Sequence, residues 1–392
     1  LIGIALAVAA LIITLAVRAG FRAEFVDTIL GANAHVTVFN SAVPDAAGNL
    51  DRTIPDYVEM AGRIAQVPGV THAAPLIKGQ VMASARGDTA GVQVFGIRGD
   101  DLANIPRIVN PETSQGDLAR FDEGIALGSG VARDLNLTLG DRIKLISPDG
   151  VKTAFGTSPR VKTYEIVYIF TAGRYDIDQT RVYMPFTEAQ SYFNRENAAD
   201  EIEVMVDHPE TVDAMALPLL NAAGDRALIW TWRDASGSFL RALDIEDNVM
   251  FVILSVLVLI ASMNIVSGLI MLVKNKGRDI GILRTMGLTE SSVLRVFFLC
   301  GASTGLIGTV LGLILGCLFA IYIDPIFALV DRLSGGGVWD PSIRGIYALP
   351  AKLQMGDVLS AIALSLGLSF VITIFPARRA ARMNPVEALR YE

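Results

Sequence analysis

Four stretches of the sequence are long, apolar and free of charged residues, and they constrain the fold more than any other feature. They cover residues 1–17, 249–273, 296–323 and 358–376. About 20 apolar residues in a helix cross the ~30 Å hydrocarbon core of a bilayer. A buried helix of a soluble protein is shorter and keeps a polar face, which these stretches lack. We therefore predict an α-helical membrane protein with four transmembrane helices.

The first stretch begins at the first residue of the chain. We expect an N-terminally truncated helix 1 that continues to residue 30 as an outer extension. A secretory signal peptide is the competing interpretation, but no A-x-A cleavage site follows, and Arg18 and the residues after it continue in helical register. A second membrane domain is expected at 248–392, with transmembrane helices at 249–273, 294–323 and 356–376 and a cytoplasmic C-terminal tail.

Lys and Arg in the loops orient these helices. The connection at 274–295 has five basic and two acidic residues, whereas the loop at 324–357 has three basic and four acidic ones. Residues 18–248 carry 21 basic and 32 acidic residues. Because short cytoplasmic loops are enriched in Lys and Arg, both termini are expected in the cytoplasm and the large segment outside. The net charge of −7 also argues against a nucleic-acid partner.

Residues 31–247 have the pattern of a large mixed α/β extracytoplasmic domain of two lobes, inserted between helices 1 and 2. Alternating apolar residues predict strands at 35–39, 70–77, 80–85, 92–97, 142–147, 162–170, 181–184 and 201–206. Helices are predicted at 57–67, 128–137, 186–192 and 211–223, the last broken near Pro218.

The motifs of common catalytic and nucleotide sites do not occur in the sequence. It contains no G-x-x-x-x-G-K-[ST] phosphate loop, no H-E-x-x-H and no G-x-S-x-G. His35, His72 and His208 lie far apart in sequence, so we expect no metal site. Cys300 and Cys317 share one helix and would lie ~25 Å apart, too far for a disulfide. We therefore expect neither an enzyme nor a cofactor-binding protein.

Glycines recur in the third apolar stretch. Small residues four apart let two transmembrane helices approach closely, either within one subunit or between subunits. We expect helix packing at Gly301, Gly305, Gly308, Gly312 and Gly316.

The basic connection before this stretch is the most informative short segment. Ile280, Leu283 and Met286 recur every three residues and predict an apolar helix edge, with Arg284 beside it. Thr289 is placed to cap the following helix. Such a short amphipathic helix either lies at the membrane interface or docks into a groove of a soluble partner.

Several segments resemble a known family. KGRDIGILRTMGLTESSVLRVFFLCGASTGLIGTVLG and the ending PARRAARMNPVEALRYE are similar to the permeases of the MacB/FtsX superfamily of ABC transporters. LIGIALAVAALIITLAVRAGFRAEFVDTILGANAHVTV and GIALGSGVARDLNLTLGDRIKLISP resemble more narrowly the lipoprotein-releasing (Lol) permeases of Gram-negative bacteria. The resemblance covers essentially the whole chain, in order.

This resemblance implies a permease of the bacterial inner membrane with a MacB-like periplasmic core domain. It implies four kinds of partner besides membrane lipid: a cytoplasmic ATPase dimer that binds ATP and Mg²⁺, a second permease subunit (identical or homologous), a lipoprotein substrate and a periplasmic lipoprotein chaperone. The cargo's acyl chains would need an apolar cavity.

The resemblance also implies residue roles. A hairpin would catch the chaperone through Phe155, Pro159 and Arg160. The coupling helix in the ATPase groove would comprise Lys276, Arg278, Asp279, Ile280, Gly281, Leu283, Arg284, Met286 and Gly287.

Two other functions stay open at this point. One is a MacB-like exporter of another substrate, and the other is an FtsX-like protein that activates an outer-face hydrolase without moving a substrate. One residue departs from the family pattern: Arg18 stands at the outer end of helix 1, where an apolar or small polar residue is expected, and its side chain would reach for lipid head groups.

Overall fold

The computed structural model describes residues 1–44, 50–153, 156–333 and 349–382. These residues form two compact units. One comprises residues 1–24 and the described residues from Arg241 onward, and the other comprises Phe25–Leu240. The division thus falls at 24/25 and 240/241, beside the domain limits of 30/31 and 247/248 expected from the sequence.

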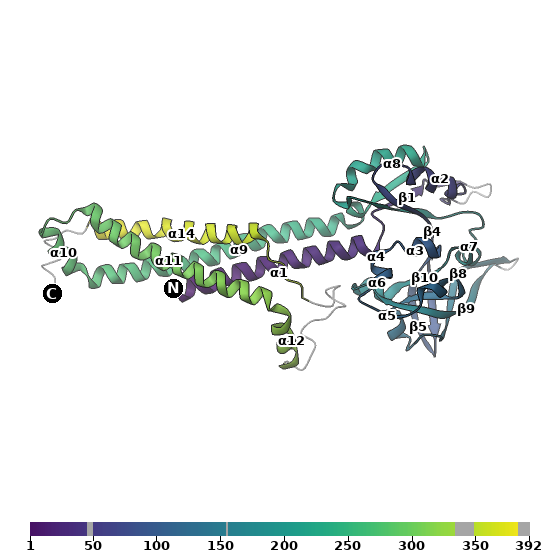
Figure 1. The fold of residues 1–392 in the computed structure, drawn as a ribbon, viewed down its shortest axis with the longest axis horizontal. Coiled ribbons are helices and arrows are strands. Elements are labelled where there is room, and N and C mark those ends of the chain that lie inside the picture. Colours follow the sequence, from purple (N-terminus) through teal and green to yellow (C-terminus); the bar gives the residue numbers. More distant parts are fainter. Residues whose placement is uncertain (45–49, 154–155, 334–348, 383–392) are drawn as a thin grey trace. The chain divides into compact units, whose positions relative to one another are not determined.

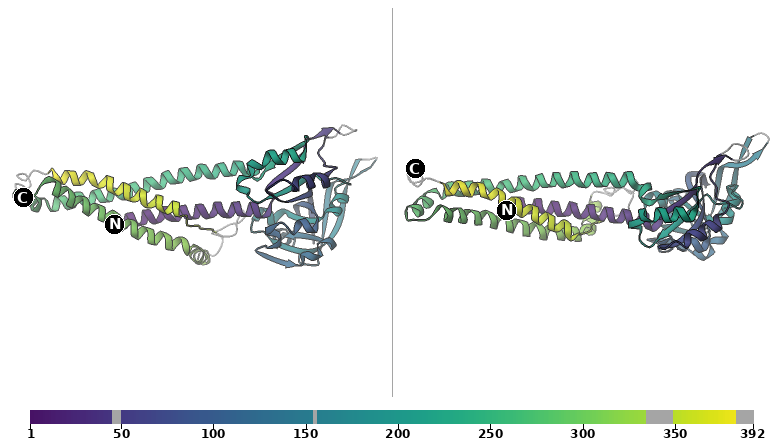
Figure 2. Two further views of the ribbon diagram at one scale, coloured as in Figure 1. Left: turned by 45° about the horizontal axis from the view of Figure 1, so that its top comes forward. Right: turned by 90° about the horizontal axis from the view of Figure 1, so that it is seen from above.

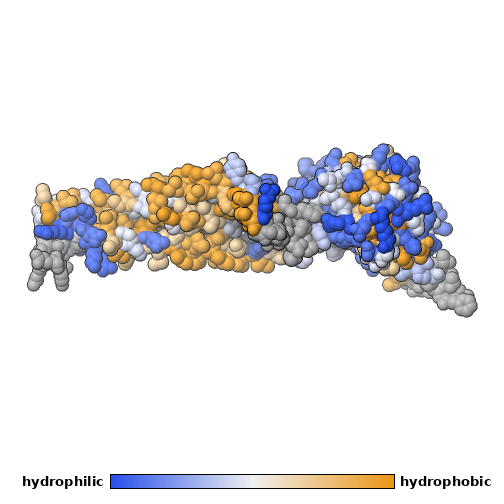
Figure 3. Space-filling view, turned by 90° about the horizontal axis from the view of Figure 1, so that it is seen from below, coloured by the Kyte–Doolittle hydropathy of each residue, from blue (hydrophilic) through white to orange (hydrophobic). Residues whose placement is uncertain are grey.

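Four long helices form most of the first unit. In the space-filling view, apolar residues cover much of the surface of these helices (Figure 3). Among the described residues, the helices long and apolar enough to span a membrane are α1 (Ile2–Ala32), α9 (Trp232–Asn275), α11 (Glu290–Ile321) and α14 (Met355–Ala381). The four predicted spans are confirmed. Two shorter helices follow in the connections, α10 (Gly277–Thr285) and α12 (Ile323–Leu333).

Helix α9 is longer than the apolar stretch that predicted it. It begins at Trp232 and has 44 residues, about 66 Å at 1.5 Å per residue. This length is about twice the hydrocarbon thickness of a bilayer. The hydropathy signal located the apolar part of the helix and gave no sign of the charged turns before residue 249, because those turns are helical without being apolar.

Helix α11 lies beside α1 and α14 (Figures 1 and 2), and its glycines contact both of these helices. A Cβ added at Gly305 would lie 2.6 Å from Ser369 of α14, and one at Gly312 would lie 2.6 Å from the carbonyl oxygen of Ala5 of α1. Gly301 likewise contacts Thr373 of α14, and Gly308 and Gly316 contact α1. Between α11 and α14, the buried hydroxyls of Thr309 and Ser365 share a hydrogen bond of 2.8 Å.

The segment before α14 crosses α1. The amide of Lys352 donates to the carbonyl oxygen of Ala16 at 2.8 Å, and Arg18 forms an ion pair with Asp357 at 3.4 Å. Asp357 lies in the first turn of α14, where a carboxylate also stabilises the helix dipole. Arg18, the residue that departs from the family pattern, therefore joins α1 to α14.

Among the described residues of the second unit, ten strands form one sheet, and nine of them pair in one continuous order. Figure 1 shows where these strands lie in the unit. The first part is an antiparallel sheet, which we call the flat sheet, of β12 (Ala227–Thr231), β1 (Val36–Asn40), β11 (Glu201–Val206) and the first half of β4 (Val70–Ala85). Pairing continues through β5 (Asp88–Ile97), β10 (Arg181–Pro185), β7 (Ile125–Gly128), β9 (Gly156–Thr171) and β6 (Thr113–Gly116). A separate short pair joins β2 (Val43–Pro44) to β3 (Leu50–Asp51).

Strand β8 (Arg142–Thr153) closes part of this sheet into a ring. It pairs with β4 on one side and β9 on the other, so β4, β5, β10, β7, β9 and β8 form a closed barrel of six strands. Inward-facing apolar side chains such as Val81, Val94, Leu127 and Leu145 fill the barrel. Because β4 belongs to both the flat sheet and the barrel, one strand holds the two parts together.

Short helices cover the remaining apolar faces. Helix α2 (Tyr57–Ala65) and α8 (Ala216–Ala223) pack on the flat sheet through Ile64 and Leu219. Beside the barrel lie α5 (Ser129–Asp134), α6 (Tyr175–Thr180) and α7 (Phe186–Tyr192). The remaining short helical segments are α3 (Gly99–Leu102), α4 (Pro106–Val109), η1 (Leu118–Glu123) and η2 (Pro209–Met215).

Most predicted strands and helices of this unit are confirmed, and several differ. The strands predicted at 70–77 and 80–85 are one strand, β4, which runs through Gly79. The expected break near Pro218 lies earlier, between η2 and α8, because a proline in the first turn of a helix needs no amide partner. Strands β7 and β12, which are short and lack alternation, were missed.

We predict that Gly312→Ala lowers the free energy of unfolding by about 1–3 kcal/mol, because the added methyl group pushes α1 away from α11. The matched control is Gly268→Ala, since a Cβ there meets nothing within 4 Å. Thermal unfolding of the two purified variants in detergent measures the difference. Equal midpoints would show that the close approach of α1 and α11 is not stabilising.

Candidate functional site

The strands β8 and β9 form a hairpin that extends beyond the barrel. Within the barrel β8 also pairs with β4, through residues 144–146. Past a register shift between Ser147 and Val151, residues 151–153 and 156–158 pair only with each other. A β-bulge at such a shift bends the strands. The pattern at 162–170 predicted only the barrel half of β9, because the half beyond the barrel has no apolar alternation.

A polar cluster anchors the base of this hairpin to α7. Arg160 donates to the carbonyl oxygen of Ser191 and, at 2.8 Å, to Oδ1 of Asn194. Glu188 accepts hydrogen bonds of 2.7 Å from both Lys162 and the Tyr164 hydroxyl. Burial, followed by this carboxylate, raises the pKa of Tyr164 well above its usual range, so the hydroxyl stays a donor.

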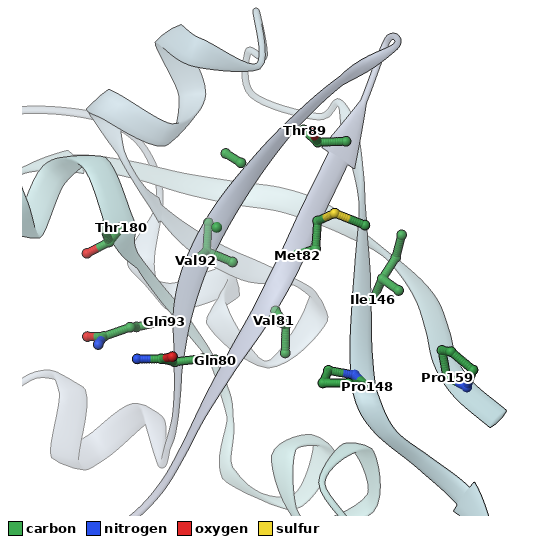
Figure 4. A pocket seen from close by; sticks show the side chains of 12 residues that line it. Gln80, Val81, Met82, Thr89, Val92, Gln93, Ile146, Pro148, Pro159 and Thr180 are labelled. Atoms are coloured by element: carbon green, nitrogen blue, oxygen red, sulfur yellow. The ribbon is translucent and has the colours of Figure 1, made fainter. Parts of the chain in front are cut away.

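An apolar row lies across three strands beside the hairpin base. Met82 of β4 pairs with Ile146 of β8, which pairs with Val161 of β9. Met82 is 44% exposed and Val161 is 54% exposed. Met82 and Ile146 of this row, together with the exposed Pro148 and Pro159, line an open pocket of about 760 Å³ (Figure 4). An exposed apolar patch of this kind on a folded domain is typical of a docking surface.

The connection between α9 and α11 ends α10 with a defined turn. Gly287 has φ +102°, a conformation that favours glycine. Its amide donates to Arg284, and the amide of Leu288 donates to Leu283 at 3.0 Å, which is a Schellman motif. The Thr289 hydroxyl then caps α11 by accepting from the amide of Ser292, as predicted.

The predicted apolar edge of α10 does not lie on one face. Ile280 is buried inside the helical unit, whereas Leu283 is 48% exposed and Met286 is 78% exposed. Three residues advance a helix by about 300°, so residues three apart drift around it by ~60° at each step. The exposed apolar surface is therefore made by Ile282, Leu283 and Met286.

Arg284 contacts this subunit's own residues. Its guanidinium donates to the carbonyl oxygen of Ala381 at 3.1 Å, at the end of α14, and forms an ion pair with Glu290 at 3.0 Å. Lys276 and Asp279 form an ion pair at 3.0 Å in the first turn of α10. These contacts hold α10 between the ends of α14 and α11.

Comparison with known proteins identifies the family. A model of the MacB-like periplasmic core domain matches residues 1–217, and a model of the FtsX-like permease C-terminal region matches residues 251–385. The lipoprotein-releasing system transmembrane protein LolC of Neisseria meningitidis is 31% identical over all of this chain and 92% of its own length. The chain belongs to the lipoprotein-releasing LolC/LolE family.

Further relatives agree with this assignment. LolC of Xylella fastidiosa strain Temecula1 is 29% identical over all of this chain and 93% of its own length, and LolE of Haemophilus influenzae is 28% identical over 99% and 92%. The periplasmic region of MacB from Actinobacillus actinomycetemcomitans matches with a TM-score of 0.35 at 10% identity, over 56% of this chain and 98% of that structure. The similarity to LolC along the full chain, the match to the MacB-like periplasmic core domain and the four long apolar helices make this chain a multi-pass inner-membrane protein with a periplasmic domain.

The structure places the residues expected from the resemblance as follows. Phe155 lies outside the described residues, and Pro159 is exposed at the base of the hairpin. Arg160 makes hydrogen bonds to the end of α7, which is a structural role in this chain. The glycines of α11 contact α1 and α14 of the same chain.

Sequence reasoning missed one group that the fold makes prominent. Buried Arg181 of β10 donates to the carbonyl oxygen of Ala32, the last residue of α1, at 2.6 Å and to Oδ1 of Asn33 at 2.7 Å. In the sequence, only an arginine at the start of a predicted strand hints at this contact. Its partners cannot be found from the local pattern, because they lie 148 and 149 residues earlier in the sequence. The contact ties the end of the first span to the barrel.

We predict that Arg160→Ala loosens the hairpin without unfolding the barrel, since it removes two hydrogen bonds worth about 1 kcal/mol each. Amide hydrogen exchange at 145–147 and 160–162 should then accelerate about tenfold or more. Lys144→Ala, on an exposed residue of β8, is the control. Identical protection in the two variants would contradict the anchoring role.

Proposed function

We propose that this chain is the permease subunit of an ABC transporter that extracts lipoproteins from the outer leaflet of the inner membrane and passes them to a periplasmic chaperone. The similarity to LolC along the full chain carries this proposal. The MacB-like and FtsX-like models alone would fit an exporter or a signalling protein equally well. The LolC and LolE relatives favour lipoprotein release over both.

The exposed part of α10 is the proposed contact for the ATPase. Both termini and this connection would lie in the cytoplasm, as the basic loops indicate. Leu283 and Met286 present apolar side chains at a helix end that Arg284 holds in place, which suits insertion into a groove. The partner ATPase would bind ATP and Mg²⁺, and its closure would move α10 together with the ends of α11 and α14.

The hairpin with its apolar row is the proposed contact for the chaperone. A carrier of acylated proteins must itself expose apolar surface, and Met82, Ile146 and Val161 offer a matching patch. Pro159 has no amide to donate, so this part of the strand edge does not invite pairing with another chain. Contact between the hairpin and the chaperone would therefore be made through side chains, which suits a transient complex in which the lipoprotein is transferred.

Depletion of the protein in its native cell tests the proposed function. Lipoproteins destined for the outer membrane should accumulate in the inner membrane, because their extraction step is lost. Fractionation of the two membranes measures this, with an integral outer-membrane barrel protein as the control for general envelope damage. Normal sorting of lipoproteins to the outer membrane after depletion would contradict the proposed function.

Two substitutions should separate the two contacts. Met286→Asp places a charge on the exposed end of α10 and should abolish co-purification of the ATPase while cross-linking to the chaperone persists. Pro159→Asp should do the reverse, so each variant is the control for the other. Loss of both contacts in either variant, or of neither, would contradict the division of roles.

A further inference from the structure

A second cavity, of about 410 Å³, lies within the periplasmic unit and has no role in the function proposed above. Its floor is the outer face of the flat sheet, and its wall comes from β10 and α6. The end of α1 and the start of α9 complete the lining through Asn33 and Ser236. The volume falls within the ~300–1,000 Å³ range of small-ligand sites.

The strand register brings an acid and an aromatic ring to the same face of this floor. Thr37 of β1 pairs with Glu203 of β11 on one side and with Trp230 of β12 on the other. Directly paired residues share one face of a sheet. Strands two apart are separated by ~10 Å, so the indole and the carboxyl group flank a gap above Thr37. Trp230 is 50% exposed.

The cationic side chains that line the cavity already have partners. Arg181 is bound to the end of α1, as described above, and lies over the ring of Phe95. Arg174 donates to Asp176 at 2.6 Å and lies over the ring of Phe25. The positive charges of Arg181 and Arg174 are therefore largely compensated by these partners in the cavity wall.

The two glutamates differ from each other. Glu201 forms an ion pair with Lys78, whose Nζ lies 3.5 Å from Oε1 of Glu201. Glu203 has no hydrogen bond and no ion pair in the part of the chain that the structure describes. Burial, followed by the charge of Glu201, raises the pKa of Glu203 to about 7, against the opposing pull of Arg181 and Lys78.

We propose that this cavity binds a ligand group with one positive charge on an apolar stem, an alkylammonium or alkylguanidinium. The Glu203 carboxylate would be its ionic partner, and the Trp230 ring would cover its stem and attract its charge. A cation close to a carboxylate favours the ionised form of that carboxylate, which burial otherwise disfavours. Aromatic faces attract cations within about 6 Å of the ring centre.

Such a group has two sources with the same chemistry, a free small amine or a basic side chain of a polypeptide. In both cases binding requires the ionised carboxylate, so affinity should fall as the pH drops below about 7. The charged and titratable groups around Glu203 are Glu201 of β11, Lys78 and His72 of β4, Arg181 of β10, Asp101 of α3, Asp176 of α6, and Arg174, which precedes α6.

The test uses the full chain in lipid nanodiscs and ligand-observed NMR. The probes are N-acetyl-lysine methylamide and its uncharged analogue N-acetyl-norleucine methylamide. At pH 8 the lysine probe should bind at least tenfold more tightly, and its affinity should drop about tenfold at pH 6, where a carboxyl of pKa near 7 is ~90% protonated. Glu203→Gln should abolish both differences, whereas Glu196→Gln, on an exposed residue outside the cavity, should keep them.

A capped Ala-Ala-Lys-Ala-Ala peptide distinguishes the sources. Binding tighter than that of the lysine probe assigns the site to a polypeptide, and equal or weaker binding assigns it to a small amine. The proposal is overturned if the lysine probe binds no better than norleucine. It is also overturned if Glu203→Gln, with an unchanged thermal midpoint, keeps the preference for the charged probe.

Discussion

The close approach of α11 to α1 and α14 is the contact on which the helical unit depends. In a bilayer, apolar side chains gain nothing by leaving lipid for protein, so helices associate through backbone proximity and interhelical hydrogen bonds. Gly312 against Ala5, and Gly305 against Ser369, provide the first, and Thr309 with Ser365 provides the second. Arg284 of α10 in turn binds the carbonyl oxygen of Ala381 at the end of α14 and Glu290 at the start of α11.

The end of α1 and the start of α9 make different contacts with the periplasmic unit. Arg181 ties the end of α1 to β10, a strand of the barrel. Helix α9 starts directly after β12, an edge strand of the flat sheet, and Trp232 donates to the carbonyl oxygen of Pro209 at 2.8 Å. Strand β4 links the two parts, and the hairpin extends from the barrel.

Features that depend on local sequence could be predicted, and those that depend on distant partners could not. Apolar length located four spans, and alternation located strands such as β1 and β11. The Thr289 cap is likewise a local signal. Closure of the barrel requires β8 to meet β4, about 60 residues away, and no local pattern encodes that pairing. The same holds for Arg18 with Asp357, which are 339 residues apart.

The structure adds contacts to the residues whose roles come from the family resemblance. The resemblance pointed to Arg160 and Arg284 as contacts for partners, because both stand in recognisable motifs. In the structure both guanidiniums bind carbonyl oxygens of their own chain, and the exposed residues beside them are Pro159, Leu283 and Met286. The strand EIEVMV did place Glu201 and Glu203 on one face, but only the fold shows that this face lines a cavity.

Transfer in a purified system tests the central claim most directly. The full chain would be reconstituted in proteoliposomes with its ATPase, its second permease subunit and a lipoprotein, and incubated with a soluble periplasmic chaperone. The account predicts that ATP moves the lipoprotein from the membrane to the chaperone, and that Met286→Asp prevents this. Release of lipoprotein to the same extent without ATP, or none with the complete system, would contradict it.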